Sequence, residues 1–278
     1  AGGVNTFAGS DSILSTAQLA GTFAACKTGT LPFEVPNYIS AIAVAYNVSG
    51  VTDLNLDAAT LAGIMSGAIT KWDDPKIVAL NSGAKLPSAA ISAVHRSDSS
   101  GTTNNFTDYL AKTAPTVWTN AANNVFPAAY KGESAAGNAG VATAITNGTN
   151  TIGYVELSYL GKLNAAKIKV GDKFVAPNNA AGAAVVAGSP LVAGRDKTDM
   201  AIAINRTTTD STQYPLVLVS YLIGCNTYAS ASVAALDKAY FQFILSPEGQ
   251  KLSETSGDGA ALSTTQANAA LAIINAIQ

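Results

Sequence analysis

Residues 35–46 read Val-Pro-Asn-Tyr-Ile-Ser-Ala-Ile-Ala-Val-Ala-Tyr, a segment that is rich in Ile, Val and Tyr and alternates in part. Pro36 and Asn47 bound this segment, so we predict a long strand that is entered from a turn. Val217–Leu222 has the same character near the other end of the chain. If both segments are long strands, the residues between them form a lobe that is inserted into a lobe made of the two chain ends.

Strand and helix patterns alternate in the block between these two strands, which is typical of an α/β protein. The elements expected in the block are strands at Ile91–Val94 and Thr151–Val155 and helices at Ala58–Ser66, Thr103–Ala111 and Gly140–Thr146. Outside it, helices are expected at Ala17–Ala25, Val233–Leu245 and Thr265–Ile277. Ala176–Gly188 is rich in Ala, Gly and Asn, and it is predicted to be a loop.

The length of 278 residues favours two lobes. Hydrophobic residues make up 48% of the chain and charged residues 12%, which indicates packed cores. We expect lobe one to comprise residues 1–45 and 214–278, and lobe two to comprise residues 46–213. The two crossing strands would act as a hinge, and the cleft between the lobes is a usual place for a small ligand.

The charge and hydropathy of the chain exclude several classes of partner. The formal net charge is −2 and no run of five like charges occurs, so DNA and RNA are not expected partners. No apolar stretch reaches the roughly 18 residues that are needed to span a bilayer. The first residues lack the features of a signal peptide, so an export signal is expected to have been removed or to lie outside this sequence.

A polar segment that contains Arg96 and Gly101 follows a predicted strand and opens a predicted helix. The free N–H groups at a helix start carry partial positive charge, and glycine lets the backbone approach an oxygen closely. Arg96 adds a full positive charge, and Asp98 is placed to hold its guanidinium in orientation. Further hydroxyl donors are Ser100, Thr102 and Thr103. The segment is predicted to bind an oxyanion, although the same residue types also suit an ordinary polar loop with a helix N-cap.

Enzyme signatures are weak in this chain. No GxxxxGK[ST] motif is present, so nucleotide hydrolysis has no visible machinery. The single histidine, His95, directly precedes Arg96, which disfavours a hydrolase triad and favours a structural role for this histidine. The alternative from the enzyme class is a secreted phosphatase or related hydrolase that uses Ser100 or Thr102 as nucleophile beside Arg96, although metal ligands are missing and so is a placed general base other than His95.

Phe7–Asp11 places a carboxylate just after a short strand-like run. A lone Asp at such a position usually caps a helix. In an anion site, Asp11 has a more specific use, because a carboxylate accepts the proton of monohydrogen phosphate and repels fully ionised sulfate. A binding protein for another oxyanion, such as sulfate, molybdate or a phosphonate, is the remaining alternative.

The two cysteines, Cys26 and Cys225, are far apart in sequence and lack a CxxC spacing. This disfavours a zinc site and a thioredoxin-like redox motif, and neither a metal ion nor a cofactor is expected. From the residues alone, a single long-range disulfide and two buried free thiols are equally good interpretations.

Several segments, in order along the chain, resemble the phosphate-binding subunit of the Pst ABC transporter, a periplasmic or lipid-anchored substrate-binding protein. The resemblance runs nearly end to end, and its most specific parts are the arginine loop and the tryptophan motif, in which Trp72 is interpreted as structural. The matching segments are Phe7–Asp11, Ile42–Asn47, Lys71–Pro75, Ala79–Asn81, Arg96–Thr103, Gly137–Val141, Ile152–Glu156 and Tyr214–Val217.

This resemblance implies a two-lobed α/β fold of the type II periplasmic-binding-protein class. It implies an extracytoplasmic, monomeric binding protein, and not an enzyme, that closes on inorganic phosphate in the interlobe cleft and delivers it to a membrane ABC permease. Position by position, it implies that Asp11 accepts the phosphate proton, that Arg96 pairs with the anion and that Asp98 steers Arg96. The residues expected to donate hydroxyl and backbone hydrogen bonds are Ser100, Gly101 and Thr102.

The sequence departs from the family pattern at its start. The family begins with a strand, a Gly-rich turn ending in Thr-Phe, a helix and a Gly-Ser-Gly segment, whereas Thr6 and Phe7 directly precede the acidic motif here. We therefore expect that a leading segment with further phosphate contacts, and any lipid anchor, is absent from this sequence or that a separate peptide completes lobe one. The extracytoplasmic setting of the family favours a disulfide between Cys26 and Cys225.

Overall fold

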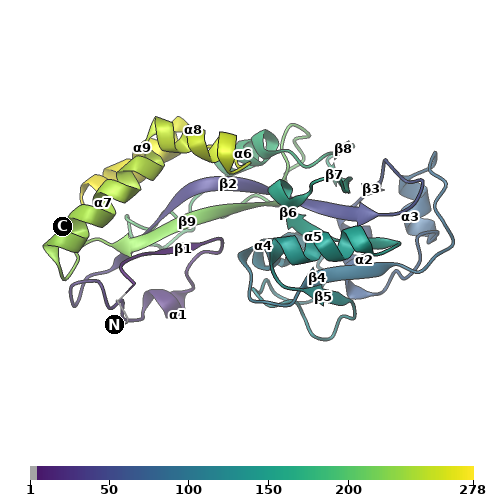
Figure 1. Cartoon of the computed structure of the whole chain (residues 1–278), viewed down its shortest axis with the longest axis horizontal. Helices are drawn as coiled ribbons and strands as arrows, with labels where there is room; N and C mark the ends of the chain where they lie inside the picture. Colours follow the sequence, from purple (N-terminus) through teal and green to yellow (C-terminus); the bar gives the residue numbers. More distant parts are fainter. Residues whose placement is uncertain (1–4) are drawn as a thin grey trace. The chain divides into compact units, whose positions relative to one another are not determined.

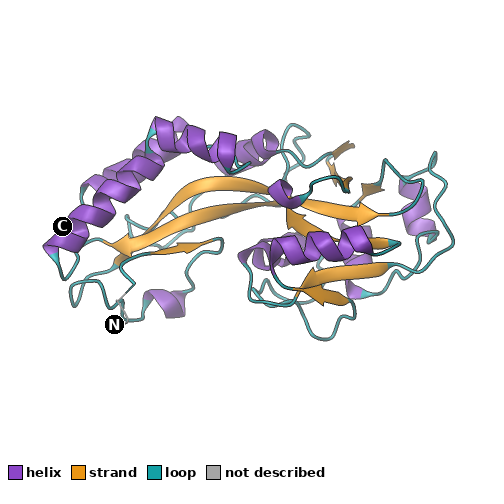
Figure 2. Ribbon diagram, viewed as in Figure 1, coloured by secondary structure: helices purple, strands orange, loops and turns teal. Residues whose placement is uncertain are grey.

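The computed structural model describes residues 5–278, and these form two compact units of mixed α/β structure (Figure 1, Figure 2). Unit 1 comprises the described residues up to Ser40, together with Val186–Ile204 and Val219–Gln278. Unit 2 comprises Ala41–Val185 and Asn205–Leu218. The α/β class predicted from the alternating pattern is confirmed. Residues 1–4 of the predicted lobe one lie outside the described residues.

Val186–Ile204 belongs to unit 1, whereas the expected lobe two of residues 46–213 would include it. The reason is a backbone connection to the start of a long strand. The N–H of Glu34 donates to the carbonyl of Thr198 (3.1 Å), and the N–H of Met200 donates to the carbonyl of Glu34 (2.7 Å). The chain therefore contributes three separate segments to unit 1.

Unit 1 contains strands in the order β1-β9-β2, with β1 antiparallel to β9. Its helices α7, α8 and α9 run along one side of β9 and β2 in Figure 1, and α7 packs against both α8 and α9. The short helix α1 lies on the side of β1. The bounds of these elements are β1 Ala8–Ser10, α1 Thr16–Leu19, β2 Pro32–Asn47, β9 Val217–Cys225, α7 Ala231–Leu245, α8 Pro247–Ser256 and α9 Thr264–Asn275.

Unit 2 is built on a mixed sheet with the order β2-β6-β4-β5, in which β4 is parallel to both β5 and β6. β2 pairs antiparallel with β6 and β7, and β7 also pairs with β3 and β8. The strand bounds are β3 Asn55–Leu56, β4 Ser92–Arg96, β5 Glu133–Ala135, β6 Thr151–Glu156, β7 Asn164–Val170 and β8 Lys173–Val175. The helix bounds are α2 Ala58–Ser66, α3 Pro75–Leu80, α4 Gly101–Thr113, α5 Gly137–Asn147, η1 Leu157–Tyr159 and α6 Asn179–Ala187.

Both faces of the unit 2 sheet are buried, because alternate residues of β2 enter different hydrophobic clusters. Val44 belongs to a cluster with Phe106 of α4, whereas Ala45 belongs to a cluster with Val141 of α5. A strand that is covered on both faces needs apolar residues at nearly every position. This explains why the second half of β2 is a continuous apolar run that alternates only in part.

Two predicted segments differ from the structure. The pattern predicts a helix over Ala17–Ala25, but α1 ends at Leu19 because the following chain is drawn towards the end of β9, where the N–H of Lys27 donates to the carbonyl of Thr227 (2.9 Å). The predicted loop at Ala176–Gly188 contains helix α6 instead. The side chain of Asn178 accepts the N–H of Ala181 (3.0 Å) at the start of α6, and the alanines that follow are strong helix formers.

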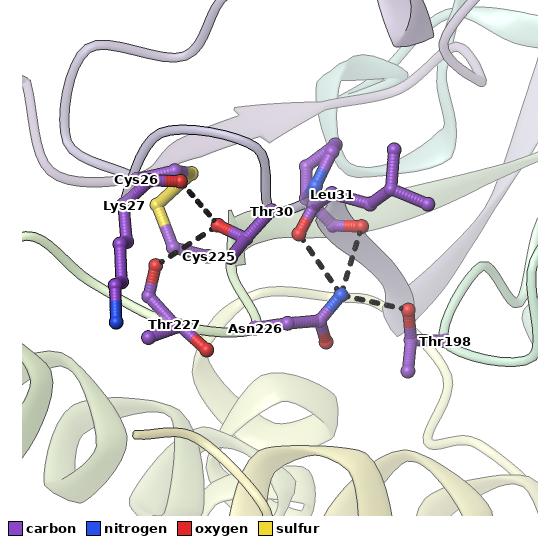
Figure 3. The surroundings of a disulfide bond; sticks show 9 residues. Cys26, Lys27, Thr30, Leu31, Thr198, Cys225, Asn226 and Thr227 are labelled. Carbon is purple, nitrogen blue, oxygen red and sulfur yellow. Dashed lines mark hydrogen bonds between the residues drawn. A yellow bond between two sulfur atoms is a disulfide. The ribbon is translucent and has the colours of Figure 1, made fainter.

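A disulfide joins Cys26 to Cys225 in unit 1, as favoured by the family resemblance (Figure 3). Polar contacts flank the disulfide on the two segments that it joins. The Thr30 hydroxyl donates to the carbonyl of Thr227 (3.3 Å), and the Asn226 amide donates to the carbonyl of Leu31 (2.9 Å). The disulfide and these bonds tie the entrance of β2 to the exit of β9.

Candidate anion-binding site

The predicted anion loop lies between β4 and α4 in unit 2. Arg96 ends β4, and α4 begins at Gly101 after a loop of residues 97–100. Ser100 is the N-cap of α4, and its hydroxyl oxygen accepts the N–H of Thr103 at 3.3 Å. The loop therefore contains a helix N-cap, as the alternative interpretation of its residue types expects. Capping uses one N–H of the first turn, whereas those of Gly101 and Thr102 have no acceptor within the helix and carry its positive dipole end.

Arg96 and Asp98 form a bidentate ion pair within this loop. Arg96 Nε donates to Asp98 Oδ1 at 2.7 Å, and Nη2 donates to Oδ2 at 2.5 Å. The hydrogen bond from Arg96 is the main reason that the pKa of the Asp98 carboxyl lies well below its usual range, and the same bond raises the pKa of Arg96. Both groups are therefore charged at neutral pH. The guanidinium is held in one orientation with donors left over.

The start of α5 donates a further hydrogen bond to the Asp98 carboxylate. Asp98 Oδ1 also accepts the backbone N–H of Gly137, the first residue of α5, at 3.1 Å. Gly137 has a φ of 68°, a left-handed conformation that favours glycine. Two helix starts thus meet at this edge of the sheet. The start of α5 holds the Asp98 carboxylate, and the start of α4 is the helix terminus predicted to bind an anion.

Glu156 and Asn138 border the same loop, and sequence reasoning did not assign them a role. Asn138 Nδ2 donates to Glu156 Oε1 at 2.7 Å, and the N–H of Glu156 donates to Asn138 Oδ1 at 3.2 Å. The Thr102 hydroxyl donates to the same Glu156 oxygen at 3.5 Å. Glu156 ends β6, which is parallel to β4, so its carboxylate and Arg96 share the carboxyl edge of the sheet. A prediction that β4 and β6 pair in parallel would have brought Glu156 to the site.

Tyr154 supports the loop from within the core. Its hydroxyl lies 2.8 Å from the Thr103 hydroxyl and accepts the N–H of Arg96 at 3.4 Å. Burial raises the pKa of Tyr154 to about 12, so the phenol stays neutral and keeps both hydrogen bonds at physiological pH. The phenol thereby connects the end of β4 to the first turn of α4.

His95 packs against its neighbours. Its ring stacks on Phe126 with 4.2 Å between the ring centroids, and Nδ1 lies 3.0 Å from the carbonyl oxygen of Arg96. These contacts fit the structural role predicted for this residue.

The predicted site residues fall into both units. Arg96, Ser100, Gly101 and Thr102 are brought together at the start of α4 in unit 2, with Asp98 beside Arg96. Asp11 is half-buried and directly follows β1 in unit 1, where Ser10 lies opposite Tyr221 of β9.

Comparisons with known proteins place the chain in a family. Residues 1–248 match the model of a family described as a PBP superfamily domain. Phosphate-binding protein PstS2 of Mycobacterium bovis BCG is 34% identical over 252 residues, which cover 89% of this chain and 68% of the relative. The chain belongs to the PstS family. PstS 2 of Mycobacterium tuberculosis matches with the same identity and the same coverage.

Solved structures show the fold of this PstS-like chain. A high-affinity periplasmic phosphate-binding protein, solved with phosphate bound, superposes with a TM-score of 0.77 at 24% identity, covering 98% of this chain and 80% of that one. A phosphate-binding protein from Stenotrophomonas maltophilia superposes with a TM-score of 0.75 at 18% identity over the same shares of the two chains. The two-lobed type II fold predicted for the PstS-like chain is therefore confirmed.

Proposed function

We propose that the protein captures inorganic phosphate, as monohydrogen phosphate, outside the cytoplasm and delivers it as a monomer to the membrane permease of an ABC transporter. The observation that carries the proposal is the fixed Arg96–Asp98 pair beside the start of α4, in a chain of the PstS family. A guanidinium that is held by its own carboxylate presents its remaining N–H groups in a constant direction, which suits a tetrahedral oxyanion.

The start of α4 supplies further donors in this proposal. The N–H of Ser100 already donates to the carbonyl of Asn124 (2.8 Å), so Ser100 contributes through its hydroxyl proton. The Thr102 side chain is buried and directed at Glu156, so Thr102 contributes chiefly through its backbone N–H, as does Gly101. Each such donor is strengthened by the helix dipole and by the charge of the ligand.

Asp11 has a separate role in the proposal. Its carboxylate accepts the proton of monohydrogen phosphate, and it repels sulfate, which has no proton to donate at neutral pH. Phosphate therefore binds and sulfate does not. If sulfate binds more tightly than phosphate, the protein is a binding protein for another oxyanion.

An extracytoplasmic location fits the disulfide between Cys26 and Cys225, since such bonds persist in oxidising compartments. Among residues 5–278, none of the helices has the length and apolarity that crossing a bilayer requires. The permease partner is proposed from relatives, among which a Vibrio cholerae structure is described as an ABC-type phosphate transport receptor.

Binding without turnover is part of the proposal. A hydrolase that uses Ser100 would need a base to take its proton. The single histidine of the sequence, His95, is stacked on Phe126 with Nδ1 beside the Arg96 carbonyl. Binding is therefore favoured over hydrolysis. Assays with p-nitrophenyl phosphate are expected to show no turnover that depends on Ser100.

Calorimetric titration tests the proposed function. The protein is titrated with phosphate and then with sulfate, at pH 5 and at pH 8. We expect one phosphate per chain at pH 8 and no sulfate at either pH. Arg96→Ala should abolish phosphate binding, and Asp11→Asn should narrow the preference for phosphate over sulfate. A folded protein that binds neither anion would overturn the proposal.

A further inference from the structure

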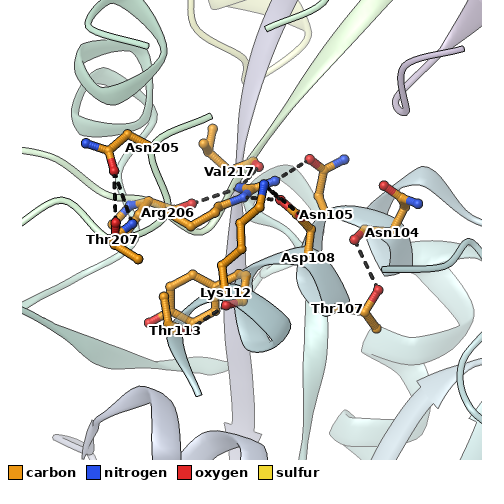
Figure 4. Close-up of polar contacts among 12 residues, drawn as sticks. Asn104, Asn105, Thr107, Asp108, Lys112, Thr113, Asn205, Arg206, Thr207 and Val217 are labelled. Atoms are coloured by element: carbon orange, nitrogen blue, oxygen red, sulfur yellow. Dashed lines mark hydrogen bonds and ion pairs between the residues drawn. The ribbon is translucent and has the colours of Figure 1, made fainter. Parts of the chain in front are cut away.

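Arg206 is a buried arginine that contacts α4 and the start of β9. The Arg206 side chain is 2% exposed and donates hydrogen bonds in four directions (Figure 4). Nη1 donates to the carbonyls of Pro215 (2.8 Å) and Val217 (2.6 Å), which lie at the start of β9. Nε donates to Asp108 Oδ2 (2.9 Å), and Nη2 donates to Asn105 Oδ1 (2.6 Å), both on α4.

Asn105 continues this connection to the first turn of α4. Its Nδ2 donates to the carbonyl oxygen of Gly101 at 3.0 Å. The orientation of the amide follows from chemistry, because a guanidinium only donates and a backbone carbonyl only accepts. Asn105 therefore must turn its oxygen to Arg206 and its nitrogen to Gly101. The side chain is buried in this position.

The carbonyl that Asn105 holds belongs to the peptide unit of the proposed anion site. The carbonyl of Gly101 and the N–H of Thr102 are parts of one planar trans peptide, so fixing the oxygen fixes the direction of the N–H. Hydrogen bonds in a chain also polarise one another. The positive charge of Arg206 polarises the Asn105 amide, and the amide in turn makes the Thr102 N–H a stronger donor.

We propose that Arg206 and Asn105 are positioning residues for the anion site, which hold the Gly101–Thr102 peptide so that the Thr102 N–H is directed at the bound anion. The inference rests on the proposed function. Arg206 itself takes no part in ligand contact. Its other bonds, to the carbonyls at the start of β9, anchor the relay to a strand of the core.

Asn105→Asp separates this role from a merely structural one. The carboxylate still accepts the hydrogen bond of Arg206, so the packing of the guanidinium is kept, but it can no longer donate to the Gly101 carbonyl. We expect phosphate affinity in calorimetry to fall about tenfold or more, as for the loss of a buried hydrogen bond. The melting temperature should also fall, because the Gly101 carbonyl loses a buried donor, so affinities are compared at a temperature at which the variant is folded.

Asn104→Asp is the matched control. It adds the same charge one residue away, on a side chain outside the relay, and so measures the electrostatic effect of the charge alone. Asp108→Asn is a second control, since it weakens the other α4 contact of Arg206 without touching Gly101. We expect it to lower the melting temperature and to change phosphate affinity by less than about threefold.

The amide proton of Thr102 gives a readout that stability does not affect. In the phosphate complex, its NMR resonance should move upfield in Asn105→Asp and in the uncharged Asn105→Ala, because the hydrogen bond to the anion weakens. Equal phosphate affinities and equal Thr102 shifts for Asn105→Asp and Asn104→Asp would overturn the relay alone. An unchanged protein that does not bind phosphate would overturn the proposed function together with it.

Discussion

The indole N–H of Trp72 donates a hydrogen bond of 3.1 Å to the backbone carbonyl of Asn150, which lies just before β6. Trp72 is fully buried, and its own backbone N–H donates to the carbonyl of Ala89. One residue thus ties the loop before α3 to the start of β6, an interior strand of the unit 2 sheet. The structural role that the sequence suggests for Trp72 agrees with these contacts.

Trp72→Phe is expected to lower the free energy of unfolding by about 1–3 kcal/mol, because the hydrogen bond of the buried indole is lost and the smaller ring fills less of the core. The Asn150 carbonyl keeps its second donor, the N–H of Ser92 (3.0 Å). Chemical denaturation measures this loss. Trp118→Phe is the matched control, since Trp118 is equally buried but its Nε1 has no hydrogen-bond partner among the described residues. If Trp118→Phe lowers the free energy of unfolding as much as Trp72→Phe does, the hydrogen bond of Trp72 contributes little to stability.

Asp98→Asn should weaken phosphate binding by about tenfold, because the amide cannot accept both hydrogen bonds of Arg96 and the guanidinium loses its fixed orientation. Simple electrostatics gives the opposite sign, since removing a negative charge beside an anion site would strengthen binding. Asp53→Asn, an exposed carboxylate of the same unit, makes the same change in net charge and should leave the affinity unaltered. Tighter binding by Asp98→Asn would show that orientation matters less than charge.

Glu34 should make the stability of the protein depend on pH. This side chain is fully buried in unit 1, and burial raises its pKa from 4.5 to about 7, with a further upward contribution from the nearby Asp199. The N–H of Leu14 and the charge of Arg195 oppose the shift. Between these two pKa values the folded protein keeps a proton that the unfolded chain has lost. The contribution of Glu34 to the free energy of unfolding is therefore largest at low pH, falls as the pH rises from 4.5 towards 7 and levels off above 7.

The free energy of unfolding should fall by about 1–3 kcal/mol between pH 5 and pH 8 through this group. Glu34→Gln keeps the side chain neutral and should remove that part of the slope. Glu254→Gln changes an exposed glutamate of α8 and should leave the slope intact. The assignment to Glu34 fails if its variant and the unchanged protein lose stability in parallel.

The Cys26–Cys225 disulfide closes a very long loop, since the two cysteines are 199 residues apart in sequence. Cys26→Ser with Cys225→Ser should lower the free energy of unfolding by about 2–5 kcal/mol. A reductant should lower the melting temperature of the unchanged protein but not that of the double variant. If the reductant lowers the melting temperatures of the unchanged protein and of the double variant equally, it does not act through this disulfide.

Much of the fold could be predicted because strong local patterns carry it. The long strand expected at Val35–Tyr46 is β2, with three further residues before it and one after. Ala58–Ser66 is a helix with the predicted bounds, since Asp57 caps its start and Gly67, at a φ of 77°, ends it. Both signals lie within a few residues of the element that they define.

The features that could not be predicted from the sequence depend on pairings between distant segments. Glu156 joins the candidate site only because β6 lies parallel to β4, and Arg206 reaches Asn105 across 101 residues of sequence. Val186–Ile204 joins unit 1 through hydrogen bonds to Glu34, which no local pattern reveals. A single sequence records which residues are present, but these partners are chosen by the sheet and the core.

Because unit 1 is made of three separate segments, its parts are translated at different times. The chain is made from its N-terminal end, so Ala8–Ser10 and Cys26 are translated long before β9 and Cys225 exist. By the time β9 is complete, the apolar segments of unit 2 that precede it have already been made. The earliest part of unit 1 therefore waits as an unpaired strand with an unpaired cysteine, and a nascent chain is most exposed to wrong pairing during that interval.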